Sequence, residues 1–250
     1  MTKALTVGLL LFVLCLPAFA EEITVAAAAD LQFALKDIAT RYKKQTGNTV
    51  KLTFGSSGNF FSQIQNGAPF DVFFSADLDY PKKLEAAGQA EPGTLYQYAT
   101  GKIVLWVRND SKLDLTKGLA VLLDPSIQKI AIANPQHAPY GRAAVAALEH
   151  EKLYEKLKDK MVLGENISQA AQFVESGSAD AGVIALSLAV APAMKEKGRY
   201  FEIPPDFYPP LRQGCVVLAS SKKKAAAAAF VEFLKKPEIA ELLKRSGFGK

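Results

Sequence analysis

The chain has 250 residues, of which 49% are hydrophobic and 22% are charged. These values are ordinary for a globular protein and exclude collagen, a disordered tail and a coiled coil. The 30 basic residues exceed the 25 acidic ones by a net charge of only +5. Apart from Lys222–Lys224 the basic residues are scattered along the chain, so no nucleic-acid partner is predicted.

The first twenty residues have the pattern of a secretory signal peptide. Lys3 provides a positive start, residues 5–16 are apolar, and Ala18-Phe19-Ala20 is a small-x-small cleavage site. The apolar segment is too short to be a membrane-spanning helix. We therefore predict that residues 1–20 direct export of the chain and that Glu21 is the first mature residue.

The two cysteines bear on this export signal and on the redox state of the mature chain. The alternative signal is that of a lipoprotein lipidated on Cys15, but Leu14 is bulky where a lipobox needs a small residue. Cleavage after residue 20 leaves only Cys215, and a single thiol cannot form an internal disulfide. Because Cys215 begins the apolar run 215–218, we predict that it is a buried strand residue.

The mature chain begins with alternating strand and helix patterns. After Asp30 apolar residues recur every three or four positions, as in a helix, and Gly47 is typical of a helix C-terminus. In chain order we predict a strand at 23–28, this helix, a strand at 50–54, a turn at 55–58, a helix at 59–66 and a strand at 72–74. The strands are continuous apolar runs, which indicates a parallel sheet covered by helices on both faces.

The rest of the chain contains a second unit of this kind. We predict strands at 103–107, 130–133, 181–186 and 216–219, an extended segment at 161–163, and helices at 141–149, 168–176, 225–235 and 237–246. The last strand and helices have no sheet of their own, so we expect them to return to the first unit. The predicted fold is α/β with two lobes, each a mostly parallel sheet flanked by helices, joined by two crossing strands. Residues 21–98 and 211–250 form the first lobe and residues 99–210 the second.

Four loops lie where predicted strands lead into helices, namely Ala28-Ala29-Asp30, Gly55-Ser56-Ser57-Gly58, Pro139-Tyr140-Gly141 and Asn166-Ile167-Ser168. Each loop offers unpaired backbone N–H groups at the positive end of a helix dipole. Taken alone, each is better explained as an ordinary helix cap than as a ligand site. Since α/β folds bind ligands at the carboxyl ends of their strands, four such loops in one cleft favour an anion site without a buried cation.

Motifs of enzymes and nucleotide-binding sites do not occur in the sequence. A G-x-S-x-G elbow, a P-loop and a G-x-G-x-x-G loop are all missing, and neither His137 nor His150 has a Cys or His partner at metal-ligand spacing. We therefore predict a binding protein that is not an enzyme and needs no metal or organic cofactor. The alternative class is an exported enzyme on the same scaffold, which would need an activated nucleophile or a metal cluster.

Five stretches of sequence carry a family resemblance. They are ITVAAAAD at 23–30, FGSSG at 54–58, GAPFDVFFSAD at 67–77, NPQHAPYG at 134–141 and the terminal Gly247-Phe248. Together they make the chain similar to the periplasmic molybdate-binding proteins of ABC transporters, over essentially the whole mature chain. The resemblance implies the two-lobe fold of type II periplasmic binding proteins. It also implies a monomer that closes on its ligand and docks on an inner-membrane permease.

The same resemblance implies how the ligand is held. In that family a tetrahedral oxyanion is bound by hydroxyl and backbone N–H groups, without a metal cation or water. Carried over to this chain, the donors are Ala29, Asp30, Ser57, Tyr140 and Ile167. Ser57 is expected to give its hydroxyl and its N–H, and Ile167 its N–H.

Two positions depart from the family pattern. Asp30 stands where many members have Ser, Thr or Asn, and a carboxylate facing a dianion would repel it by several kcal/mol. We therefore expect Asp30 to contribute only its N–H and to turn its side chain away, either capping the helix at Leu31 or pairing with Arg142. Ala185 stands where some members have a ligand-binding tyrosine, and we expect the Tyr140 hydroxyl to replace it.

Ligand choice is open among several oxyanions. Molybdate and tungstate have nearly the same size and charge, so a cage of donors hardly separates them. Sulfate and phosphate are the alternatives within the binding class. A cage built only of donors rejects a protonated anion, because the extra O–H has no acceptor. Asp30 is an acceptor, however, so its state bears directly on whether a protonated ligand is admitted.

Overall fold

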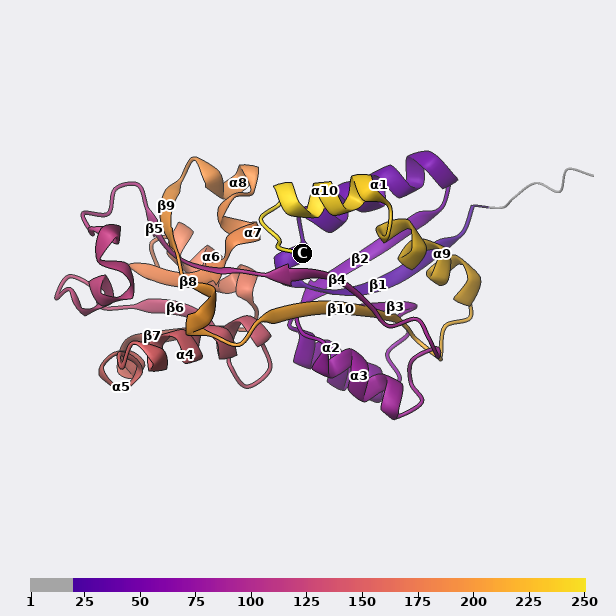
Figure 1. Cartoon of the computed structure of the whole chain (residues 1–250), viewed down its shortest axis with the longest axis horizontal. Coiled ribbons are helices and arrows are strands. Elements are labelled where there is room, and N and C mark those ends of the chain that lie inside the picture. The colour runs from indigo at the N-terminus through magenta and orange to yellow at the C-terminus, as the bar shows by residue number, and fades with distance from the viewer. Residues whose placement is uncertain (1–19) are drawn as a thin grey trace, which may run out of the picture.

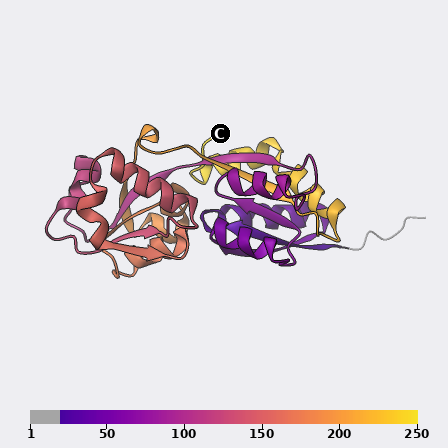
Figure 2. The ribbon, with the colours of Figure 1, turned by 90° about the horizontal axis from the view of Figure 1, so that it is seen from below.

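The computed structural model describes residues 20–250 and has two lobes that lie side by side along its long axis (Figure 1). Each lobe is a five-stranded sheet with helices on both faces, as predicted for an α/β protein. Seen from below, the two lobes lie next to each other and the chain crosses between them (Figure 2). Apart from its last residue, the predicted signal peptide lies outside the described residues. Among those residues, no helix is both long enough and apolar enough to cross a bilayer.

The first lobe combines the two ends of the described chain. Its sheet has the order β2-β1-β3-β10-β4, with strands β1 (Glu22–Ala28), β2 (Thr49–Gly55), β3 (Val72–Ser75), β4 (Tyr96–Gly101) and β10 (Leu211–Val217). Its helices are η1 (Ala29–Leu31), α1 (Ala34–Thr46), α2 (Ser57–Gln65), α3 (Asp79–Ala86), α9 (Lys224–Leu234) and α10 (Pro237–Arg245). The C-terminal strand and helices therefore return to the first lobe, as the sequence indicated.

Successive side chains along the strands of this lobe point to opposite faces of the sheet, so its core has two layers. Val25 and Phe74 face α1, α9 and α10, where Tyr42 meets Phe230 edge to face at 5.0 Å between ring centroids. Their neighbour Phe73 faces the opposite way, toward α2 and α3. Figure 1 shows the two helix layers on opposite sides of the sheet. Burial on both faces explains why these strands read as continuous apolar runs.

The second lobe is formed by the middle of the chain. Its sheet has the order β7-β6-β8-β5-β9, with strands β5 (Ile103–Arg108), β6 (Ile130–Ala133), β7 (Met161–Gly164), β8 (Ala181–Ala185) and β9 (Gly198–Glu202). Its α-helices are α4 (Pro139–His150), α5 (Tyr154–Leu157), α6 (Ile167–Glu175), α7 (Leu186–Ala189) and α8 (Pro192–Lys195), and η2 (Leu115–Leu123), η3 (Lys158–Lys160) and η4 (Pro205–Phe207) are 3₁₀ segments. One continuous apolar core holds this lobe together.

The chain crosses between the lobes at two places. β4 runs into β5 with only Lys102 between them, and residues 203–210 lead from β9 back to β10. The boundary predicted between residues 98 and 99 thus falls inside β4. Each sheet is mixed rather than mostly parallel, because β10 and β5 run antiparallel to both of their neighbours. In β5 and β10 the chain runs away from the boundary between the lobes. In the other strands of both sheets it runs toward that boundary.

Candidate anion-binding site

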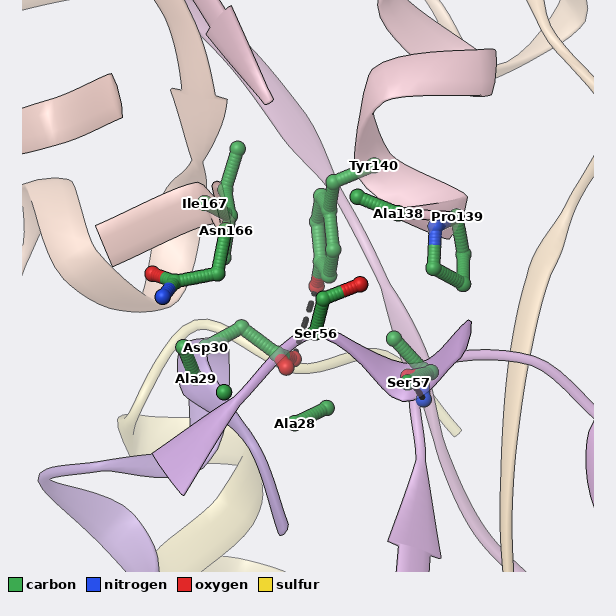
Figure 3. A pocket seen from close by; sticks show the side chains of 12 residues that line it. Ala28, Ala29, Asp30, Ser56, Ser57, Ala138, Pro139, Tyr140, Asn166 and Ile167 are labelled. Carbon is green, nitrogen blue, oxygen red and sulfur yellow. Dashed lines mark hydrogen bonds between the residues drawn. The ribbon is translucent and has the colours of Figure 1, made fainter. Parts of the chain in front are cut away.

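A small cavity, with about 10 Å³ open to the centre of a water-sized sphere, lies between the lobes (Figure 3). It is lined by Ala28, Ala29, Asp30, Gly55, Ser56, Ser57, Ala76, Ala138, Pro139, Tyr140, Asn166 and Ile167. All five residues predicted from the sequence as ligand donors are in this set. The cavity is smaller than the pockets of several hundred Å³ that hold organic ligands. Its size therefore suits a small ion.

The cavity is built where strands end and helices begin. The ends of β1 and β2 lead into η1 and α2, which carry Asp30 and Ser57. In the other lobe, β6 and β7 lead through short loops into α4 and α6, which begin at Pro139 and Ile167. The carboxyl ends of both sets of strands meet at the cleft, so four helix starts from the two lobes converge on one small space.

Ser57 has two hydrogen-bond donors at the cavity, its hydroxyl and its backbone N–H. Its hydroxyl oxygen accepts a hydrogen bond from the Ala76 N–H at 2.9 Å, which holds the oxygen in place and leaves the hydroxyl proton free. Ser56 precedes the helix but does not cap it; its hydroxyl instead donates to the His137 carbonyl of the other lobe at 2.6 Å. The first N–H of α2, that of Ser57, therefore has no acceptor within the described residues.

The helix starts of the second lobe leave donors free in the same way. The Asn166 side chain caps α6 by accepting from the N–H groups of Ser168 and Gln169 at 3.0 and 3.1 Å. The Ile167 N–H is left out of this cap and donates to no acceptor in the described part of the chain. In α4 the first helical residue is Pro139, which has no N–H, so Tyr140 provides the first free donor.

Asp30 does not turn away from the other lobe. Its side chain is buried, and its Oδ2 accepts from the Tyr140 hydroxyl at 3.0 Å and from Gln213 Nε2 at 2.7 Å. Figure 3 shows the Asp30 carboxylate pointing at the Tyr140 hydroxyl. Gln213 Nε2 also donates to that hydroxyl, and its Oε1 accepts from Tyr98. Four elements, η1, α4, β10 and β4, are joined through this buried network.

Burial raises the pKa of Asp30 to about 6, and the hydrogen bonds from Gln213 and Tyr140, together with the nearby backbone N–H groups of Asp30 and Leu31, oppose that rise. Its second carboxylate oxygen, Oδ1, has no hydrogen-bond partner in the described residues. No Lys, Arg or His side chain from residues 20–250 lines the cavity, so Asp30 is its one charged group.

The predicted partners of Asp30 are wrong on both counts. The helix at Leu31 has no side-chain cap, and Arg142 pairs with Asp77 at 2.6 Å. Residues two apart on a helix do not share a face, so Arg142 cannot follow Tyr140 into the cavity. The Tyr140 hydroxyl gives its proton to Asp30, so it is not free to replace a hydroxyl missing at Ala185.

Several hydrogen bonds hold the two lobes against each other around the cavity. The His137 carbonyl accepts from the Gly58 N–H at 2.9 Å as well as from Ser56, and the Ser187 hydroxyl donates to the Asp30 carbonyl at 2.9 Å. Since Ser56 gives its only proton to that carbonyl, it must accept from His137 Nδ1, which lies 2.9 Å away. The lobes are thus closed on the cavity.

Sequence reasoning missed Gln213 and the interlobe role of Ser56. Gln213 lies in a polar stretch of the chain that carries no loop or motif signal, and Ser56 reads as an ordinary cap. Within residues 20–250, no group of three or more His, Cys, Asp or Glu side chains is placed to hold a metal ion. The arrangement can hold a small anion by neutral donors from both lobes.

This fold and cavity define a two-lobed solute-binding protein. The chain matches the family described as bacterial extracellular solute-binding protein over residues 23–249. The molybdate-binding protein ModA of Rhodobacter capsulatus is 41% identical, with 94% of this chain and 91% of the relative covered. The chain belongs to the molybdate-binding family within the solute-binding proteins.

Two further comparisons agree with this membership. ModA of Azotobacter vinelandii is 43% identical over 92% of this chain and 90% of the relative. The solved structure of the periplasmic molybdate-binding protein of Azotobacter vinelandii aligns with a TM-score of 0.86 at 37% identity, covering 91% of this chain and 99% of that one. The sulfate-binding protein SubI of Mycobacterium tuberculosis, with a TM-score of 0.73 at 16% identity, shares the fold.

Proposed function

We propose that this protein captures molybdate, or tungstate, in the cavity between its lobes and delivers it to an ABC permease of the inner membrane. It acts as an exported monomer in the periplasm and uses no metal cation or organic cofactor. The observation that carries this proposal is the convergence of free N–H groups and the Ser57 hydroxyl on a small cavity that no cationic side chain of residues 20–250 lines. Family membership supports molybdate as the ligand.

A tetrahedral dianion suits this set of donors. The N–H groups at the starts of α2, α4 and α6 carry the positive ends of three helix dipoles, which attract negative charge. Ser57 donates through its hydroxyl and N–H, and Ile167 and Tyr140 through their N–H groups. The Ala29–Asp30 turn closes the fourth side. Donors left empty in a dry cavity are costly, so an anion that fills all of them is preferred.

Capture follows from the division of the donors between the lobes. Ser57 and the Ala29–Asp30 turn belong to the first lobe, whereas Tyr140 and Ile167 belong to the second. An anion bound to one lobe gains its remaining hydrogen bonds only when the other lobe closes over it. Closure is therefore driven by the ligand, and the closed form is the one that docks on the permease.

Phosphate is the second candidate ligand, and Asp30 is the reason to consider it. Phosphate keeps a proton near neutral pH, and an ionised Asp30 could accept it. Molybdate and tungstate carry no proton there and need donors only. The state of Asp30 therefore separates the two candidates.

Isothermal calorimetry of residues 21–250 against molybdate, tungstate, sulfate and phosphate tests the proposal. Molybdate and tungstate are expected to bind with the highest affinity. Ser57→Ala removes one charge-assisted hydrogen bond, so it should weaken molybdate binding by about 1.5–3 kcal/mol, which is roughly ten- to a hundredfold.

The matched control for this variant is Ser62→Ala, on the exposed face of the same helix, which should bind as the wild type does. Molybdate affinity that is unchanged by Ser57→Ala would contradict the assigned role. Binding of sulfate or phosphate in clear preference to molybdate would identify a different receptor.

Ligand binding should also raise the melting temperature. A ligand present at 100 times its dissociation constant stabilises the closed form by about 2.7 kcal/mol, which for a chain of this size corresponds to roughly 5 to 10 °C. Differential scanning calorimetry with and without molybdate measures the shift. A shift with phosphate and none with molybdate would favour the second candidate.

A further inference from the structure

The Asp30 carboxylate lines the anion cavity with its two oxygens in unlike states. Oδ2 accepts two hydrogen bonds, from Tyr140 and Gln213, whereas Oδ1 is buried and accepts none within the described residues. A buried carboxylate oxygen without a donor is costly when the group is ionised. The same oxygen is well placed to carry a proton, because a neutral acid group has one acceptor oxygen and one O–H donor.

Every ionisable group of the network around Asp30 other than Asp30 itself stays neutral. Burial, followed by the charge of Asp30, holds the pKa values of the Tyr140 and Tyr98 hydroxyls well above their ordinary range. Gln213 of β10 has no charge. The starts of α2 and α6 present Ser57 and Asn166, which are also neutral.

The side chains near the cavity that can carry a charge form ion pairs or hydrogen bonds with residues other than Asp30. Arg142 of α4 pairs with Asp77 at the end of β3, and its side chain is 43% exposed. His137, in the loop before α4, is bonded to Ser56. On α7 the nearest group is the Ser187 hydroxyl, which donates to the Asp30 backbone carbonyl. Within residues 20–250, therefore, no cation compensates a charge on Asp30.

We propose that Asp30 binds the anion as a neutral carboxylic acid, donating Oδ1–H to an anion oxygen, so that each dianion captured takes up one proton from solvent. This inference rests on the proposed function. The proton binds to Oδ1 when the lobes close on the anion and returns to solvent on release. Asp30 thereby serves as a donor in this chain instead of repelling the ligand.

Electrostatics favours this protonation. An ionised Asp30 beside a dianion would place three negative charges in a cavity that has no cation. Burial alone already raises the pKa of Asp30 to about 6, and a neighbouring dianion raises it further. A carboxylic acid kept neutral by its surroundings so that it can donate a hydrogen bond is established chemistry for buried sites.

A consequence for selectivity follows from the same geometry. With a proton on Oδ1, the cavity offers only donors to the ligand. A fully deprotonated oxyanion satisfies all of them, whereas a protonated one brings an O–H that finds no acceptor. The neutral form of Asp30 therefore selects molybdate, tungstate or sulfate against phosphate.

The test is calorimetry of molybdate binding between pH 6 and pH 9, in buffers of different ionisation enthalpy, which counts the protons taken up. For the wild type we expect uptake that approaches one proton per anion above about pH 7. Affinity should fall about tenfold for each pH unit in that range, because the free protein must be protonated to bind.

Asp30→Asn is the decisive variant, since its amide resembles the neutral acid. Its carbonyl can accept from Tyr140 and Gln213 while its NH₂ donates to the anion. We expect it to bind molybdate without proton uptake, with an affinity that is flat with pH and exceeds that of the wild type at pH 9. Asp79→Asn, at an exposed position of the same lobe, is the matched control and should keep the wild-type pH profile.

Each outcome decides the question. Wild-type binding of molybdate with no proton uptake and no pH dependence overturns the inference and leaves the proposed function standing. A pH dependence of molybdate affinity that persists in Asp30→Asn also overturns the inference and leaves the proposed function standing. Preferential binding of phosphate that is lost in Asp30→Asn shows that Asp30 accepts a proton from the ligand, which also overturns it. If no oxyanion binds at any pH, the proposed function fails as well.

Discussion

Replacing Gly58 with alanine is expected to weaken molybdate binding by about a hundredfold or more, without unfolding either lobe. Gly58 is in the first turn of α2, and its N–H donates to the His137 carbonyl of the other lobe at 2.9 Å. A Cβ at this position would lie 2.6 Å from that carbonyl oxygen and 2.8 Å from the His137 Cβ. Both distances are far inside ordinary non-bonded separations.

The other close neighbour of the added Cβ is the Tyr80 hydroxyl of the same lobe, at 2.6 Å, the far end of a flexible side chain that can move aside. Opening the lobes relieves the clash with His137, which is why the affinity rather than the fold should suffer. With the lobes apart, the anion loses the N–H groups of Tyr140 and Ile167. Two charge-assisted hydrogen bonds together contribute about 3–6 kcal/mol, which is the source of the expected loss. Calorimetry measures the affinity, and small-angle scattering with saturating molybdate should show the variant remaining more extended than the wild type.

Gly249→Ala is the control for this experiment, because the nearest atoms to its added Cβ lie at 3.6 Å, an ordinary contact distance. It should bind molybdate as the wild type does. If Gly58→Ala also bound with unchanged affinity, the close approach of α2 to the loop at His137 would not be needed for capture.

Replacing Gln213 with leucine is expected to lower the free energy of unfolding by about 3 kcal/mol at pH 8. The side chain is fully buried and joins Asp30, Tyr140 and Tyr98. An apolar replacement removes a hydrogen-bond donor from Asp30 and from Tyr140, whereas the Tyr98 hydroxyl keeps the Ser75 carbonyl as an acceptor at 3.0 Å. Each such loss costs about 1–3 kcal/mol, less whatever the neighbours recover among themselves. The melting temperature should fall by roughly 6 to 12 °C.

The effect of Gln213→Leu should depend on pH with a definite sign. Burial raises the pKa of Asp30 to about 6 in the folded protein, above its value in the unfolded chain, so folding favours the protonated form. Above that pKa Asp30 is ionised and depends on its donors; below it the neutral group needs them less. The destabilisation should therefore be larger at pH 8 than at pH 5, as measured by chemical denaturation.

The matched control is Gln63→Leu, at an exposed position of α2, which should change stability by no more than about 0.5 kcal/mol. A loss in Gln213→Leu no larger than in this control would mean that the network between the lobes contributes nothing to stability. An equal loss at both pH values would mean that the charge of Asp30 is not part of it.

The fold was predictable wherever its signals are local. Apolar runs such as 72–74 and 181–185 are strands because burial on both sheet faces demands it, and the helix that ends at Gly47 has its expected left-handed C-terminal glycine. β4 and the start of β10 were not predicted as strands, since Tyr96–Gly101 and Leu211–Gly214 mix polar and apolar residues. Those polar residues include Tyr98 and Gln213 of the first lobe, which belong to the buried network that reaches Tyr140 of the second lobe.

By itself, the sequence determined which loops face the cleft and which donors they carry. Each of these loops leads from a strand into a helix, and the first N–H groups of a helix have no partner within the helix, whatever surrounds it. Only the tertiary structure decided the partners of Asp30. Tyr140 and Gln213 lie 110 and 183 residues away along the chain. Tyr140 reaches Asp30 because the lobes close, and Gln213 reaches it because β10 returns to the sheet of the first lobe, between β3 and β4. Both contacts depend on packing between distant parts of the chain, and no local pattern in the sequence records that packing.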